Sequence, residues 1–131
     1  MERNRPARNG HRDHVDGEPV FSFIETAVLD PHPRLLVERL LFARALLQAN
    51  AVLGPRFVLG ECAAAHHIVL GNAATGFAAA DRLMTYGFRV EPSLDPPGIR
   101  LFLASWHSEA EIRALLVAIT IVIRELETAA R

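Results

Sequence analysis

The stretch His66–Ile119 decides the fold of this chain: HHIVLGNAATGFAAADRLMTYGFRVEPSLDPPGIRLFLASWHSEAEIRALLVAI. It opens with a short apolar run, His66–Leu70, which is typical of a buried strand. Asn72 has the residue type of a helix N-cap, and Gly87 occupies the position of a C-terminal glycine cap. We therefore expect an alanine-rich helix between them. Its inward face is expected to carry Phe77, Ala80, Leu83 and Met84.

Two further apolar runs follow, and a tight turn joins them. Phe88–Leu94 and Ile99–Ala104 are separated by Asp95-Pro96-Pro97-Gly98, which predicts an antiparallel pair of strands. Ser108 and Glu111 then form the S-x-x-E pattern of a capping box, so a last helix begins there. Its apolar positions, at helical spacing, are expected to face the core as far as about Glu127.

Upstream of this stretch the pattern predicts one more helix. Leucine and alanine recur at helical spacing from Arg34 until Gly54-Pro55 ends the periodicity, whereas residues 1–19 are polar and predict a disordered arm. The order helix-strand-helix-strand-strand-helix predicts an α+β fold for residues 20–131. We expect a small, mainly antiparallel sheet of three to four strands with helices on one face.

Composition excludes several classes of function. The 131 residues carry a formal net charge of −1, which disfavours a nucleic-acid binder. The single cysteine, Cys62, allows no internal disulfide and favours a reducing, cytoplasmic location. The most apolar run, Ala114–Ile123, is too short to span a membrane. His66 and His67 are neighbours on a predicted strand, so their side chains point to opposite faces, and no metal site is expected.

The order of elements, together with PPGIR and WHSEAEI, resembles the small C-terminal domain of the α-oxoamine synthase family. These enzymes belong to the fold-type I aminotransferase superfamily and include 8-amino-7-oxononanoate synthase and 5-aminolevulinate synthase. They condense an amino acid with an acyl thioester by means of pyridoxal phosphate. The resemblance extends over roughly Phe21 to Leu126, the last third of such an enzyme.

The resemblance implies roles for two residues. Arg100, at the position of the family's substrate-binding arginine, would hold the carboxylate of an amino acid. Thr26, in the phrase Phe23–Pro31, matches a hydroxyl that lies near the cofactor phosphate, although Glu25 and Asp30 depart from the family pattern. Without the resemblance, Arg100 would be interpreted as a surface arginine paired with Glu91 or Asp95. His107 is interpreted as structural.

The chain contains no lysine, because all 14 of its basic residues are arginine. Pyridoxal phosphate in this family is attached to a lysine amine. The sequence therefore predicts no catalytic residue of its own and no cofactor unless a partner domain supplies the lysine. We expect either a free-standing or truncated C-terminal domain that needs a separate large chain, or a small non-catalytic module that binds carboxylates or amino acids.

The chain has more apolar residues than one small core would bury. Phe21, Phe23 and Ile24, together with the run Leu115–Ile123, predict a surface that a partner or a second copy of the chain covers.

Overall fold

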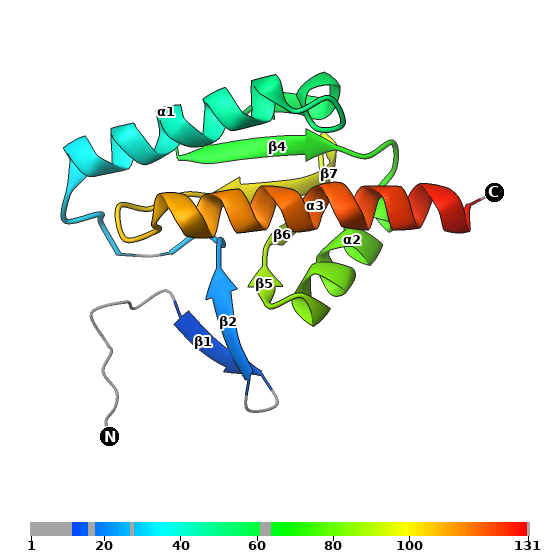
Figure 1. Ribbon diagram of the computed structural model, residues 1–131, viewed down its shortest axis with the longest axis horizontal. Coiled ribbons are helices and arrows are strands. Elements are labelled where there is room, and N and C mark those ends of the chain that lie inside the picture. The colour runs from blue at the N-terminus through cyan, green and yellow to red at the C-terminus, as the bar shows by residue number, and fades with distance from the viewer. Residues whose placement is uncertain (1–11, 16–17, 27, 61–63, 131) are drawn as a thin grey trace.

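The computed structural model describes residues 12–15, 18–26, 28–60 and 64–130, and it confirms the expected α+β class (Figure 1). The helices are α1 (Pro33–Ala49), α2 (Ala73–Thr85) and α3 (Glu109–Ala129), and a 3-10 turn, η2 (Gly54–Arg56), follows α1. The strands are β1 (Arg12–Val15), β2 (Glu18–Ser22), β3 (Phe57–Leu59), β4 (Ala65–Val69), β5 (Phe88–Arg89), β6 (Glu91–Leu94) and β7 (Pro97–Phe102).

The main sheet has four antiparallel strands in the order β3-β4-β7-β6. β6 and β7 form the hairpin that the Pro-Pro-Gly turn predicts, with Leu94 opposite Pro97. The sequence predicted one continuous strand over Phe88–Leu94, and this was wrong. The chain leaves regular pairing at Val90, because Phe88 and Arg89 pair with β2 whereas Glu91–Leu94 pairs with β7.

A second, smaller sheet has the order β1-β2-β5. It lies where the sequence predicted a disordered arm: part of residues 1–19 falls outside the described residues, and Arg12–Val15 and Glu18–Pro19 lie in β1 and β2. β2 pairs in parallel with β5, and the rings of Phe21 and Phe88 are 6.0 Å apart. β5 therefore offers this segment both hydrogen bonds and an aromatic contact.

All three helices contribute to one core on one face of the main sheet. Ile68, Ile99 and Leu101 are fully buried and belong to the same apolar cluster as the inner residues of the helices. The alternate residues, His67, Arg100 and Phe102, lie outside that cluster. In Figure 1, α1 and α3 run roughly along the direction of β4, which is seen between them, and α2 lies beside β5 and β6. The opposite face of the sheet thus carries none of these helices.

Helix α2 packs through a face that differs from the expected one. Its buried residues are Gly76, Ala79, Ala80 and Leu83, whereas Phe77 is 51% exposed. The expected inward position of Phe77 was therefore wrong. Gly76 lies directly over the backbone of Gly98, where any side chain would collide with the Gly98 carbonyl oxygen. This backbone contact sets the rotation of the helix and turns Phe77 outward.

The predicted helix caps are present. Asn72 Oδ1 accepts a hydrogen bond from the Thr75 N–H at 2.8 Å, and Gly87 has a positive φ of 88° after the end of α2. In the capping box of α3, Ser108 Oγ accepts from the Glu111 N–H, and Glu111 accepts in return from the Ser108 N–H. The Asn72 cap and the Ser108–Glu111 box satisfy backbone donors that the start of a helix leaves unpaired.

The apolar run in α3 is not buried on all sides. Leu115, Ile119 and Ile123 are in the core, but Val117 is 60% exposed and Ile121 is 41% exposed. Within the described residues, no helix is long and apolar enough to cross a membrane.

The close approach of α2 to β7 gives the first prediction. Gly76→Ala should lower the free energy of unfolding by about 2 kcal/mol, because overpacking against backbone typically costs about 1–3 kcal/mol. In an exposed helix the same change would stabilise by about 1 kcal/mol. Urea unfolding followed by the fluorescence of the single tryptophan measures the difference.

Gly71→Ala is the matched control. Gly71 has a φ of +85°, but nothing lies within 4 Å of the place that a Cβ atom would take there, so only a left-handed backbone cost of about 1 kcal/mol is expected. A Gly76→Ala variant as stable as the wild-type chain would contradict the packing of α2 on Gly98.

His66 gives the second prediction. It is fully buried on β4 and stacks on Phe57, and neither of its ring nitrogens has a hydrogen-bond partner among the described residues. Burial, helped by the positive charge of Arg44, lowers the pKa of His66 from 6.5 to about 4. Between pH 4 and pH 6.5 the unfolded chain therefore binds a proton on His66 that the folded chain does not bind.

Stability should accordingly fall as pH decreases from 6.5 toward 4, by up to about 3 kcal/mol at about 1.36 kcal/mol per pKa unit. The His66→Leu variant should lose much less stability over the same interval. Urea midpoints for both proteins, measured at neutral pH and near the folded-state pKa, test this. Equal losses in the two proteins would show that His66 is not the group responsible.

Candidate functional site

Arg100 is the centre of a polar row on the helix-free face of the main sheet. In the strand register, His67 lies opposite Arg100, and Glu91 lies opposite Arg100 on the other side. Residues that are paired across antiparallel strands point to the same face. The row His67–Arg100–Glu91 therefore crosses β4, β7 and β6 on the side away from the core.

The guanidinium of Arg100 is held in place, but not all of its hydrogen-bond donors have an acceptor among the described residues. Its NH2 group donates to Glu91 Oε1 at 2.7 Å, and the guanidinium carbon lies 5.3 Å from the ring centroid of Phe102. The Nε atom is buried and has no acceptor among the described residues. An unmatched buried donor costs about 1–3 kcal/mol, so a further acceptor would stabilise this group.

The segment Phe23–Asp30, which the structure describes except for residue 27, runs beside this row. The Phe102 N–H donates to the Phe23 carbonyl at 2.8 Å, and the Glu25 N–H donates to Glu91 Oε2 at 3.2 Å. Glu91 therefore joins the segment to Arg100, one carboxylate oxygen for each. Thr26 is exposed on this segment, and its hydroxyl donates to the Val28 carbonyl at 3.3 Å.

Both site residues singled out from the sequence, Arg100 and Thr26, thus belong to elements that meet at Glu91. The pairing of Arg100 with Glu91 is the one expected if Arg100 is a surface arginine. The second contact of Glu91, to the Glu25 backbone, and the position of Phe102 under the guanidinium were missed. Alternation along β7 could have indicated Phe102, since residues two apart on a strand share a face.

His107 anchors the start of the segment. Its Nδ1 accepts a hydrogen bond from the Ala104 N–H at 2.9 Å, so the ring proton is on Nε2, which donates to the Ser22 carbonyl at 2.7 Å. The buried ring also stacks on Phe23, with centroids 4.0 Å apart. With one nitrogen accepting and the other donating to backbone groups, this histidine has a structural role.

Asp30 fixes the other end of the segment. Its two carboxylate oxygens accept from the Ser105 N–H at 2.8 Å and from the His32 N–H at 2.9 Å. Burial acts to raise the pKa of Asp30, but the hydrogen bonds from Ser105 and His32 outweigh it and leave the pKa below its ordinary value. The segment is therefore tied to the end of β7 on both sides of Thr26.

A cavity of about 280 Å³ lies under this segment, bordered by Thr26, Phe102, Trp106 and His107 among others. It is smaller than the usual volume of a ligand pocket, about 300–1,000 Å³. Arg100 itself does not line this cavity, but its neighbours Phe102 and Glu25 do. The closed part of the site can therefore receive no more than a small group.

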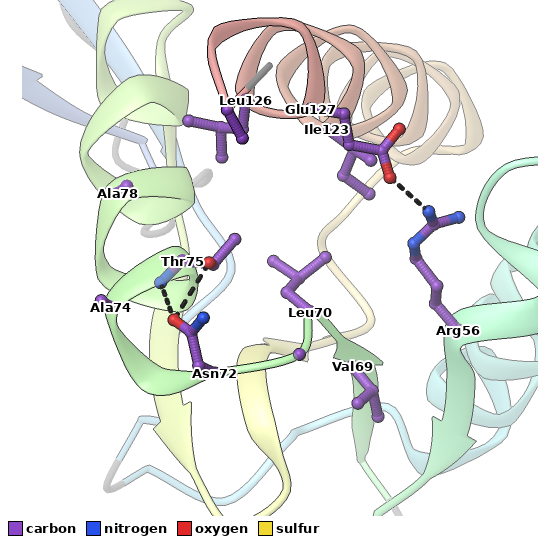
Figure 2. Close-up of a pocket in the computed structure, with 12 residues that line it drawn as sticks. Arg56, Val69, Leu70, Asn72, Ala74, Thr75, Ala78, Ile123, Leu126 and Glu127 are labelled. Carbon is purple, nitrogen blue, oxygen red and sulfur yellow. Dashed lines mark hydrogen bonds and ion pairs between the residues drawn. The ribbon is translucent and has the colours of Figure 1, made fainter.

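A larger cavity of about 600 Å³ lies elsewhere, between the start of α2 and the end of α3 (Figure 2). Its charged residues are paired with each other, because Arg56 NH2 lies 2.6 Å from Glu127 Oε2. Asn72 Oδ1 is occupied by the cap of α2. The remaining wall is largely apolar. Both terminal nitrogens of Arg56 are occupied, because NH1 donates to the Val52 carbonyl and NH2 donates to Glu127. Nε of Arg100, by contrast, has no acceptor among the described residues. This cavity is therefore a weaker candidate for a carboxylate than the Arg100 face.

Among the residues from 12 to 130 that the structure describes, no group of three metal-ligating side chains comes together. The chain matches no protein-family model, and no curated protein is similar to it in sequence. Any function is therefore argued from the site itself.

The contacts of His107 give the third prediction. His107→Phe retains a ring that can stack on Phe23 but leaves the Ala104 N–H and the Ser22 carbonyl without their partner. Two buried unpaired groups should lower the free energy of unfolding by about 3 kcal/mol. His32 is the matched control, because it is exposed and caps α1 without a side-chain hydrogen bond. His32→Phe should therefore change the free energy of unfolding by less than about 0.5 kcal/mol.

Urea unfolding of the two variants beside the wild-type chain measures both values. Equal effects of the two substitutions would contradict the anchoring role of His107.

Proposed function

We propose that this chain acts as the small domain of a pyridoxal-phosphate enzyme that resembles the α-oxoamine synthases. In that role it would complete a site whose lysine lies outside these 131 residues. The observation that supports the proposal is the face of the main sheet that none of the three helices covers: Arg100, with 37% of its side chain exposed, stands on it between the buried His67 and Phe102, with the Thr26 segment beside it. A face of this kind can be covered by a second, larger domain.

The residues of this chain do not fit the cofactor by themselves. There is no lysine among them, and the carboxylate of Glu25 precedes Thr26, where a phosphate would be repelled. The covalent chemistry would have to come from the other domain. What this chain supplies is binding: Arg100 offers a forked cation to the carboxylate of an amino-acid substrate, and the apolar ring of Phe102 holds the guanidinium from beneath.

A second candidate is a small module that binds carboxylates without catalysis. The partial exposure of the Arg100 side chain, 37%, favours it, because ligands could approach the isolated chain. The two candidates differ in whether the chain acts alone. In the first, useful affinity arises only with a partner domain, whereas in the second the isolated chain binds.

The fourth prediction separates these candidates. The purified chain mixed with pyridoxal phosphate should show no visible absorption band beyond that of the free cofactor, because no lysine amine is present. Calorimetry with glycine, alanine and propionate should detect no saturable binding if a partner domain is required. A stable new band, resistant to gel filtration, would contradict the proposal.

Binding by the isolated chain would instead favour the module. In that case Arg100→Ala should weaken it about ten- to hundred-fold, the loss expected for a hydrogen-bonded charge pair. Arg113→Ala, which removes an arginine stacked on Phe42 in another part of the molecule, is the matched control and should leave the affinity unchanged.

A further inference from the structure

We propose that Glu91 is an internal carboxylate that occupies Arg100 and keeps the carboxylate site closed until it is displaced. This inference rests on the proposed function, because it assumes that Arg100 serves an external carboxylate. It adds a regulatory residue that the assignment of Arg100 does not require.

The geometry of the guanidinium leaves one route for an external carboxylate. A bidentate pair uses either Nε with one terminal nitrogen, or both terminal nitrogens. Nε of Arg100 is buried, so the first arrangement is shut off from solvent. The second needs NH2, which already donates to Glu91 Oε1 at 2.7 Å. An incoming carboxylate must therefore compete with Glu91 for the same nitrogen.

Glu91 is also held from its other side. Its Oε2 accepts from the Glu25 N–H at 3.2 Å, so the carboxylate bridges Arg100 and the Phe23–Asp30 segment. Moving the segment away would remove one of the two donors that hold Glu91. The same segment carries Val28 and Leu29, with exposed fractions of 73% and 90%, which a partner domain could cover. Contact with a partner there would thus be coupled to the opening of Arg100.

The chain contains a second arginine in an almost identical setting. Arg82 NH1 lies 3.0 Å from Glu125 Oε1, and Glu125 Oε2 accepts from the Tyr86 hydroxyl at 2.6 Å. Here too one carboxylate is held between an arginine and a second donor. The Arg82–Glu125 pair joins α2 to α3, and neither residue belongs to the row around Arg100. It is therefore a matched control for the Arg100–Glu91 pair.

The test measures how fast each arginine of the full chain reacts with phenylglyoxal, followed by peptide mass spectrometry. The reagent attacks the free guanidine, so a paired carboxylate slows it. Glu91→Gln should speed the reaction of Arg100 about five-fold, the factor expected when a partly exposed ion pair is lost, and leave Arg82 unchanged. Glu125→Gln should do the reverse.

Propionate then tests the ligand side. In the Glu91→Gln chain, millimolar propionate should slow the reaction of Arg100, and propionamide should not. In the wild-type chain propionate should have a smaller effect. Glu91→Asp, which keeps the charge but is one methylene shorter, should also speed Arg100. It serves as the second variant if circular dichroism finds Glu91→Gln misfolded.

The outcomes separate this inference from the proposed function. If Arg100 reacts equally fast in the wild-type and Glu91→Gln chains while Arg82 responds to Glu125→Gln, the proposal that Glu91 occupies Arg100 is refuted. If Glu91→Gln speeds Arg100 but propionate gives no protection, Glu91 does shield Arg100 and the carboxylate role of Arg100 fails instead. Faster reaction together with protection by propionate supports both.

Discussion

The contact between Gly76 and Gly98 constrains most of the remaining structure. A side chain at Gly76 would overlap the Gly98 carbonyl, so α2 packs directly on the backbone of β7, and a Cβ atom at Gly98 would overlap the carbonyl of Ile68 on the neighbouring strand β4. This closeness fixes the rotation of α2 and brings Ala79 and Leu83 onto the core. Because α3 in turn packs on α2, the whole helical layer is placed on one side of the sheet. The other side carries none of the three helices.

Because only one face of the sheet is covered by the three helices, β7 can contribute core residues on one face and the polar row on the other. Ile99 and Leu101 face the helices, and Arg100 and Phe102 alternate with them. The ring of Phe102, two residues along the strand, packs against the guanidinium of Arg100. An arginine without such a neighbour would lack this contact. The segment from Phe23 to Asp30 then closes over the end of this face, tied by His107 at one end and by Asp30 at the other.

Much of this could be predicted from the sequence, because it depends on local signals. Asn72, Gly87 and the Ser108–Glu111 box act within one turn of chain, and the Pro-Pro-Gly turn joins strands that are neighbours in sequence. The errors concern contacts between distant residues. Phe77 was expected inside because periodicity cannot register that Gly76 meets Gly98. The break at Val90 depends on the pairing of β5 with the distant strand β2, and β2 in turn pairs with β1 on its other side.

The candidate site divides in the same way. Arg100 could be named from its local motif, but the bridging role of Glu91 depends on the Glu25 backbone, 66 residues away. In the proposed role of Arg100 as a carboxylate-binding residue, the Glu91 bridge has a physical advantage. It orients the guanidinium and neutralises it, yet a partly exposed ion pair of this kind is worth only about 0–1 kcal/mol. A carboxylate that binds both terminal nitrogens gains a second charge-assisted hydrogen bond, so it can displace Glu91 once the segment that steadies it has moved.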